Sequence, residues 1–549
     1  MRNAFKNNQS IIFLALIAML AAVPGLIYGF AGHDSFIHAL WAKRFSALLA
    51  GGEIYPRFDP EVFLGNGSYA FFFYPPLTIY INSAFSFLGS ESNYFMPVIN
   101  TSMILAILTA IATSYFWLRN YEMKVRLLGV ALYIFFPPFL AFYAYISTGV
   151  GMVWAYAFAP LLLMGIVRII ENRRYGFALY TFAQTLIILT NIPATIIYLP
   201  IATIYGFYCA NKKSHYAKLI FSSLLSLIIC AVYILPMIFL KDLMNLHSHW
   251  DTVIGFKYQE HFVNFSSFID SKAPYFLIIV LTYVLTVGLV LFLLKKLGAG
   301  LGKKSIFSIV IIISILFLSC SLSSFLWEQI SILQIIQFPF RFMLATPLFL
   351  VPIIAKYVEQ DVKERIMQVS AIIIIPAIIL AIFVAYISSN KIQHIPSGIK
   401  AYFTNNIEYY PHYTPKKDDL YKYFFITPLD ELKKNRKVEI MDGAMAGIKN
   451  LTWQPREITA EISAESGAKI WFRRFYIDGW QAEIDGERVL LEKDDFNNMI
   501  VSTEKDYKNS ILKISLPPYW HERLGAWLSA FGMLILIASL ICSKFRRNN

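Results

Sequence analysis

Apolar, uncharged runs long enough to cross a lipid bilayer recur along this chain. Examples are residues 97–118, 220–240, 276–294 and 366–388. A helix needs about 20 such residues to cross the hydrocarbon core, and within that core every backbone polar group must bond inside the segment, which favours helix. Charged residues make up only 15% of the sequence, against about 25% in soluble domains. The sequence therefore predicts an α-helical polytopic membrane protein.

About twelve crossings are predicted, and the basic loops give their direction. Lys and Arg gather in short loops that should face the cytoplasm, at residues 119–126, 168–174, 212–218, 295–304, 356–365 and 544–547. These loops alternate regularly with basic-poor or long loops only if the apolar segment 71–88 does not cross. We therefore expect 71–88 to be interfacial or re-entrant on the outer side. An ordinary second crossing there is the alternative, and it would invert every later assignment. The predicted crossings are 11–30, 97–118, 127–147, 151–170, 176–191, 193–210, 218–240, 276–294, 305–321, 341–357, 367–388 and 524–543.

The chain divides into three predicted parts. Residues 1–388 form a membrane module that includes a first outer loop at 31–96. Residues 389–523 have a soluble composition and form an outer-facing domain that is β-rich in 449–518, where Asp485-Gly486 between alternating runs is a tight-hairpin signal. Residues 524–549 supply the last crossing and a basic cytoplasmic tail. We expect the outer domain to help bind an acceptor or to cover the site.

Several function classes are disfavoured by the sequence. No basic helix interleaved with aromatic residues occurs, so a nucleic-acid partner is not expected. The predicted cytoplasmic loops are short and contain no P-loop or dinucleotide fingerprint. The four cysteines lie in apolar runs without metal-site or redox spacing. Charges are nearly absent inside the crossings, which disfavours an ion-coupled transporter.

Ionisable and aromatic residues gather instead in the first outer loop. The candidate site residues there are His33, Asp34, His38, Glu53, Tyr55, Arg57, Asp59 and Tyr74, and Arg341 joins them from a later outer segment. Asp34 is the candidate catalytic residue, and the others are candidates for substrate binding.

These residues carry a resemblance to a known group of enzymes. An acidic residue after the first crossing (Asp34), an amphipathic helix, the turn at 55–57 and the Tyr-Pro-Pro-Leu helix at 74–77 resemble the first outer loop of GT-C glycosyltransferases. Within that superfamily the pattern is similar to the bacterial membrane family labelled 6-pyruvoyl-tetrahydropterin synthase related. The segment 337–342 resembles a second motif of this family, and the strands around 479–486 resemble its terminal β-domain. The soluble synthase is a zinc enzyme with clustered histidines, and no such triad is evident here.

The resemblance implies a multi-pass protein of the bacterial inner membrane with an outward-facing active site. It would move a sugar from a polyprenyl-phosphate donor to a glycan, lipid or protein acceptor. A lipid phosphate leaving group requires a cation, for which Arg57 and Arg341 are the best candidates because a guanidinium binds phosphate bidentately. The acceptor hydroxyl must lose a proton to a base. Asp34 matches the family position, and Glu53 and Asp59 are weaker alternatives.

Plainer interpretations of these residues remain open. Asp34 can cap the helix that follows it, and with His38 four residues later it could share a divalent metal ion, although no cofactor is firmly expected. Arg57 and Arg341 can anchor lipid headgroups, and residues 71–74 can form an interfacial aromatic belt. The competing functions are a lipid or oligosaccharide flippase and an inactive GT-C-like scaffold in envelope glycan assembly.

Overall fold

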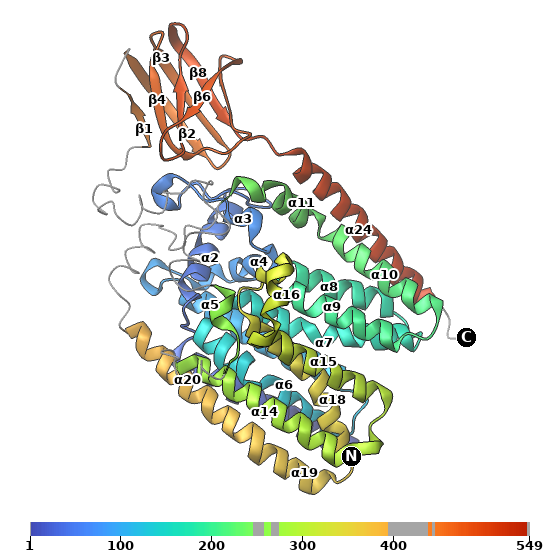
Figure 1. Cartoon of the computed structure of the whole chain (residues 1–549). Helices are drawn as coiled ribbons and strands as arrows, with labels where there is room; N and C mark the ends of the chain where they lie inside the picture. The colour runs from blue at the N-terminus through green and yellow to red at the C-terminus, as the bar shows by residue number, and fades with distance from the viewer. Residues whose placement is uncertain (1, 245–256, 265–273, 394–436, 442–444, 546–549) are drawn as a thin grey trace.

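The computed structural model describes residues 2–244, 257–264, 274–393, 437–441 and 445–545. A bundle of long helices forms its larger part, and a β-domain lies beyond one end of this bundle (Figure 1). In this described part, nine helices are long and apolar enough to cross a membrane, and the bent pair α10–α11 makes a tenth if it is one span. The predicted polytopic helical class with a β-domain before the last crossing is confirmed.

The long helices occur where crossings were predicted. They are α1 (Arg2–Tyr28), α5 (Met96–Trp117), α6 (Met123–Ile134) with η4 (Pro138–Ser147), α7 (Val150–Ile170), α9 (Ile192–Cys209), α14 (Pro274–Leu297), η9 (Pro339–Ala345) with α18 (Thr346–Val358), α19 (Val362–Val369) with η10 (Ser370–Ile374) and α20 (Ile375–Gln393), and α24 (Trp520–Phe545). Two more predicted crossings match the shorter helices α8 (Gly176–Ile188) and α15 (Lys303–Ser319). The remaining one matches α10 (Lys213–Ile229) and α11 (Ala231–Leu240), which bend by 68° at their junction.

The predicted first outer loop folds into helices of 3 to 16 residues, each shorter than the about 20 residues that a crossing needs. They are α2 (Ser35–Ala50), η1 (Phe63–Gly65), α3 (Ala70–Phe73), α4 (Pro76–Ala84), η2 (Ser86–Leu88) and η3 (Glu91–Asn93). The nine residues of α4 extend only about 14 Å, less than half of a hydrocarbon core. Helix α4 packs against α2, α5 and α7. The expectation that 71–88 stays on one side agrees with this length.

Smaller elements connect the later helices. They are η5 (Lys241–Leu243), η6 (Tyr258–His261), η7 (Gly298–Gly300), η8 (Ser321–Ser323), α16 (Ser324–Gln329) and α17 (Ser331–Gln334).

The β-domain contains eight antiparallel strands in the described residues. They are β1 (Val438–Ile440), β2 (Ala446–Gln454), β3 (Glu457–Ala464), β4 (Lys469–Phe475), β5 (Gln481–Ile484), β6 (Glu487–Lys493), β7 (Asn498–Ser502) and β8 (Tyr507–Ser515), in the order β1-β4-β7-β6-β5-β8-β3-β2. The first part of β6 pairs with β5 and its last part pairs with β7. Strand β3 alternates strictly between half-buried and buried residues, as expected for a strand with one face on a core.

The β-rich region is confirmed and extended. Strands β1 and β2 both begin before residue 449, the predicted start of this region. The predicted hairpin at Asp485-Gly486 joins β5 to β6, with both residues at positive φ (51° and 85°). Much of the predicted outer segment 389–448 lies outside the described residues.

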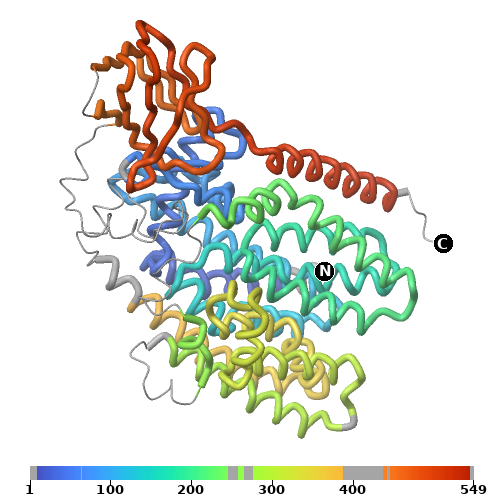
Figure 2. Tube along the Cα trace, turned by 45° about the horizontal axis from the view of Figure 1, so that its top comes forward, coloured from blue at the N-terminus to red at the C-terminus, as the bar shows by residue number. Residues whose placement is uncertain are grey.

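The β-domain packs directly on the first outer loop, and the two lie side by side in both views (Figures 1 and 2). The Tyr69 hydroxyl donates to the Phe475 carbonyl (2.8 Å) and accepts from the Trp480 indole N–H (3.0 Å). The Phe475 N–H donates to the Asn66 carbonyl (2.8 Å). Helix α24 then leaves the β-domain and packs along α10 and α11.

Candidate functional site

Asp34 is held at the start of α2 by the turn that ends η4. The Gly32 N–H donates to the Thr148 hydroxyl (2.8 Å), and the Asp34 N–H donates to the Ser147 carbonyl (2.9 Å). This approach is so close that a Cβ on Gly32 would overlap the Ile146 carbonyl oxygen. A glycine two residues before Asp34 is therefore required for this docking.

The Asp34 carboxylate does not cap α2. Asp34 occupies the N-cap position, but its side chain makes no capping hydrogen bond. Instead, Oδ2 accepts a 3.0 Å hydrogen bond from the Ser147 hydroxyl. The carboxylate is half-buried and has no ion-pair partner among the residues described. It is thus oriented by the membrane module and stays accessible to a ligand.

Ser147 and Tyr143 both lie on a π-helical segment. Pro137-Pro138 ends the regular helix α6, and the chain continues as η4 with i→i+5 geometry because proline cannot donate to the preceding turn. Such wide turns are rare and occur frequently at functional sites. Thr148 ends this segment at φ 53°. The Tyr143 and Ser147 side chains of this segment contact Arg341 and Asp34.

Arg341 reaches the same place from the start of η9. Its Nε donates to the Tyr143 hydroxyl (3.2 Å) and its Nη1 donates to the Ile336 carbonyl (2.7 Å). The guanidinium lies 4.5 Å from the Phe338 ring centroid. Gln337, at φ 63°, makes the turn that precedes Pro339. Arg341 is half-buried and has no carboxylate partner within the described part of the chain.

Asp34 and Arg341 are therefore brought together through η4. Arg341 donates to Tyr143, Ser147 donates to Asp34, and Ser147 lies one π-helical turn after Tyr143. We refer to Asp34, Tyr143, Ser147 and Arg341 as the Asp34 cluster. It places a carboxylate and a guanidinium, each without an ion-pair partner among the described residues, on one frame.

The two candidate histidines of the first outer loop differ in burial. His33 is exposed, whereas His38 is only 6% exposed. The centroid of the His38 ring lies 5.7 Å from that of Trp41 and 5.8 Å from that of Tyr74. Burial lowers the pKa of His38 to about 4, although Asp34 opposes this shift. His38 is accordingly a neutral packing residue at pH 7. The described residues contain no group of three His, Cys, Asp or Glu side chains suited to a metal ion.

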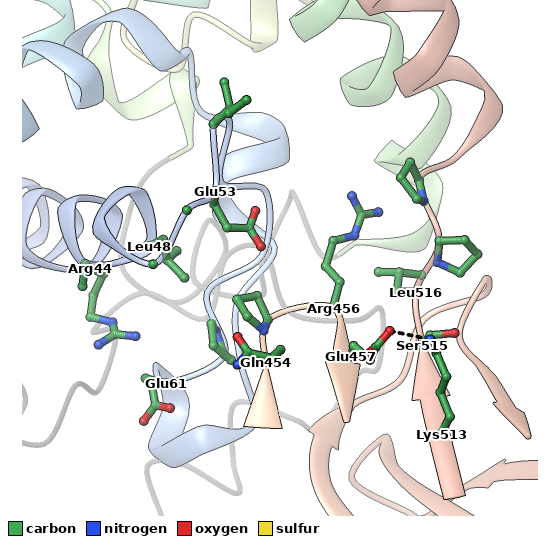
Figure 3. A pocket seen from close by; sticks show the side chains of 18 residues that line it. Arg44, Leu48, Glu53, Glu61, Gln454, Arg456, Glu457, Lys513, Ser515 and Leu516 are labelled. Atoms are coloured by element: carbon green, nitrogen blue, oxygen red, sulfur yellow. Dashed lines mark ion pairs between the residues drawn. The ribbon is translucent and has the colours of Figure 1, made fainter. Parts of the chain in front are cut away.

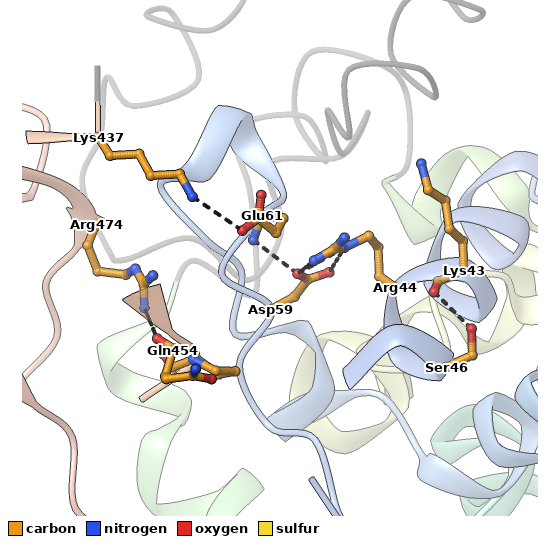
Figure 4. Close-up of polar contacts among 9 residues, drawn as sticks. Lys43, Arg44, Ser46, Asp59, Glu61, Lys437, Gln454 and Arg474 are labelled. Atoms are coloured by element: carbon orange, nitrogen blue, oxygen red, sulfur yellow. Dashed lines mark hydrogen bonds and ion pairs between the residues drawn. The ribbon is translucent and has the colours of Figure 1, made fainter. Parts of the chain in front are cut away.

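Asp59 is already occupied by an ion pair. Arg44 on α2 binds both of its carboxylate oxygens, at 2.8 to 3.1 Å, and Asp59 is only 2% exposed. Figure 4 shows Arg44 reaching Asp59, with Glu61 beside them contacting Lys437 of the β-domain. The pair fixes the loop 51–62 against α2.

Arg57 lies in a second cluster. Its Nη2 donates to the Val232 carbonyl (2.6 Å) at the bend of α10–α11, and its Nε lies 3.8 Å from Glu522 Oε2. The guanidinium stacks on Tyr55 at 3.6 Å from the ring centroid. Arg456 of the β-domain binds both oxygens of Glu522 (2.9 and 3.1 Å). Tyr55, Arg57, Arg456 and Glu522 form the Glu522 cluster, which joins the first outer loop, the β-domain and α24.

Glu53 and Tyr55 belong to this second region. Burial raises the pKa of the half-buried Glu53, while Arg456 opposes the shift. Burial also raises the pKa of Tyr55 to about 12, again against a nearby guanidinium, that of Arg57. The candidate residues of the first outer loop thus form two groups. Asp34 and His38 lie near the start of α2, whereas Glu53, Tyr55 and Arg57 lie beyond its end.

Four residues of these clusters were not predicted from the sequence: Tyr143, Ser147, Arg456 and Glu522. Tyr143 and Ser147 were included in an apolar crossing, where the polar pair Ser147-Thr148 at its outer end was the available signal. Arg456 and Glu522 carry no local signal, because only the docking of the β-domain brings them to Arg57.

Comparisons with known proteins give a distant likeness to a solved structure. No protein-family model and no curated protein matches the sequence. Among solved structures, the chain is similar to the archaeal oligosaccharyltransferase AglB from Archaeoglobus fulgidus in complex with an inhibitory peptide and a dolichol-phosphate. The TM-score is 0.41 at 12% identity, over 75% of this chain and 61% of that one. The match spans about three fifths of the archaeal protein and does not establish a shared family.

Proposed function

We propose that this chain is a GT-C-type membrane glycosyltransferase that moves a sugar from a polyprenyl-phosphate donor to an acceptor on the outer face of the membrane. The observation that carries the proposal is the Asp34 cluster, in which a carboxylate and a guanidinium share one hydrogen-bonded frame. The sequence resemblance described above points to the same chemistry.

The roles follow from what the reaction requires. The oxygen of the acceptor hydroxyl bonds to the anomeric carbon of the sugar, and Asp34 accepts the proton that this hydroxyl loses. The bond between that carbon and the phosphate oxygen breaks, and the polyprenyl phosphate leaves with the electron pair. Arg341 stabilises the charge that develops on this phosphate. Tyr143 and Ser147 orient the two groups.

The position of the cluster fits a lipid-linked donor. Asp34 follows the apolar helix α1, Ser147 ends the span Met123–Ser147, and Arg341 begins the span Pro339–Val358. The basic loops 119–126 and 168–174 lie at the opposite ends of neighbouring helices, which supports an outward-facing site in the bacterial inner membrane. A donor whose lipid stays in the bilayer would present its phosphate at this level.

The test is turnover by the purified full-length protein in liposomes. Polyprenyl-phosphate sugars are supplied with glycan, lipid and peptide acceptors, and the release of polyprenyl phosphate and the formation of glycosylated product are both measured. We expect equal amounts of the two products. Movement of the lipid-linked sugar across the bilayer without any new glycosidic bond would refute the proposal and indicate a flippase.

A further inference from the structure

A cavity of about 900 Å³ lies between the first outer loop and the β-domain (Figure 3). One wall comes from the C-terminal half of α2 and the loop that follows it. The other comes from the β2–β3 turn, the end of β8 and the segment before α24. Its volume is within the range of about 300–1,000 Å³ that is typical of ligand sites. The cavity exists only because the two domains are docked.

The charged groups of the walls leave one carboxylate unpaired. Most of the charged side chains are engaged, in the pairs Arg44–Asp59, Arg456–Glu522, Lys513–Glu457 and Lys437–Glu61. Glu53 has no ion-pair partner among the described residues. Its side chain and that of Arg456 come from opposite walls (Figure 3).

Arg456 brings hydrogen-bond donors to the same cavity. One N–H from each of its Nη nitrogens binds the Glu522 carboxylate, and each of these nitrogens carries a second N–H. The Arg456 side chain is 17% exposed and lines the cavity. A ligand in the cavity can therefore accept a hydrogen bond from this guanidinium.

The two groups together select a neutral ligand rich in hydroxyls. The lining carries three cationic side chains (Arg44, Arg456 and Lys513) and three carboxylates (Glu53, Glu61 and Glu457), so it offers no excess of charge to either an anion or a cation. A hydroxyl can donate to the carboxylate and accept from the N–H at once. The apolar parts of the walls, which can contact the C–H faces of a sugar ring, are Leu48, Ile54, Pro60, Pro455, Leu516 and Pro517.

We infer that this cavity binds a neutral saccharide segment of the acceptor. The inference rests on the proposed function for its link to the reaction. From Asp34 to the cavity wall at Arg44 and Gly51, α2 extends by about 15–26 Å. The donor must keep its sugar–phosphate bond at the Asp34 cluster and its lipid in the membrane. The acceptor is therefore the substrate that extends along α2 into the cavity, as a chain of several sugars.

Binding is tested on the full-length protein in a detergent without a sugar headgroup. Two neutral trisaccharides, chitotriose and maltotriose, are titrated by saturation-transfer NMR, and inorganic phosphate is the charged comparison. Glu53→Ala removes the carboxylate, and Ala47→Trp fills the cavity from an exposed position of α2. Each variant should weaken binding by about tenfold or more, as expected for the loss of hydrogen bonds to a charged group or of the space itself.

Matched controls separate this inference from the proposed function. Glu504→Ala removes an exposed β-domain carboxylate and should bind like the wild type, as should Asp34→Asn, which is expected to lose turnover. The inference is overturned if neither trisaccharide binds, if phosphate displaces a bound trisaccharide, or if Glu53→Ala and Ala47→Trp bind normally. Displacement by a polyprenyl-phosphate sugar would overturn the assignment to the acceptor.

Discussion

Replacement of Asp34 by asparagine tests whether this carboxylate is the general base. Asn keeps the size of the side chain and an oxygen that can accept from the Ser147 hydroxyl, the bond that Asp34 makes at 3.0 Å. It cannot take up the proton of an acceptor hydroxyl. We therefore expect Asp34→Asn to insert and fold normally but to lose turnover.

The structure predicts a small loss of stability and a large loss of turnover for Asp34→Asn. Weakening one charge-assisted hydrogen bond to a neutral one costs about 1 kcal/mol of stability. Loss of a cap adds nothing, because the Asp34 side chain makes no capping bond to α2. General-base catalysis is worth about 10²–10⁴-fold, or about 3–5 kcal/mol in the barrier. The loss of activity should thus greatly exceed the loss of stability.

The assay is release of polyprenyl phosphate by purified Asp34→Asn, with thermal unfolding measured on the same sample. Ser147→Ala is the matched variant, since it removes the hydroxyl that orients Asp34 and leaves the carboxylate in place. Its turnover should fall by less than that of Asp34→Asn. Near-normal turnover of Asp34→Asn would refute the reasoning, and the base would then be sought at Glu53.

Three further predictions concern other residues. Arg341→Lys should lower turnover by at least about tenfold, because a lysine cannot keep the bonds to Tyr143 and Ile336 while facing a phosphate bidentately; wild-type kinetics would contradict this. Glu522→Gln should destabilise the protein by about 2–4 kcal/mol in thermal unfolding, because the buried Arg57 and the half-buried Arg456 lose their carboxylate, and Glu504→Ala should not. Burial lowers the pKa of His38 from 6.5 to about 4 on folding, so folding stability should fall by about 3 kcal/mol as the pH falls from above 6.5 to below 4. His38→Phe should flatten that dependence, and an unchanged pH curve would contradict it.

The sequence predicts the helical part of this fold well because a bilayer imposes one strong rule. Each uncharged run must be a helix, and the alternation of basic loops adds the prediction that 71–88 does not cross. What the runs do not reveal is the geometry inside a crossing. The π-helical η4 and the 68° bend between α10 and α11 depend on how prolines and neighbouring helices share backbone hydrogen bonds, which hydropathy does not report.

The candidate site was predicted in part, for a similar reason. Asp34 and Arg341 are polar residues next to apolar runs, so each is conspicuous alone, and the structure places them on one frame. Arg57 is equally conspicuous, yet it contacts Glu522 and the bent helix. Whether Arg57 or Arg341 lies in the Asp34 cluster depends on long-range packing. The local sequence around each arginine does not show which of the two it is.

The two clusters at the ends of α2 divide the work of the proposed enzyme. All four members of the Asp34 cluster belong to the membrane module, so the groups that carry out the proposed reaction do not depend on the β-domain for their contacts. The cavity beside Glu53, in contrast, requires Arg456 of the β-domain. A change in the β2–β3 turn can therefore alter which acceptor is bound without moving the groups that carry out the reaction. In this arrangement, specificity for the acceptor can change while the chemistry of the donor stays the same.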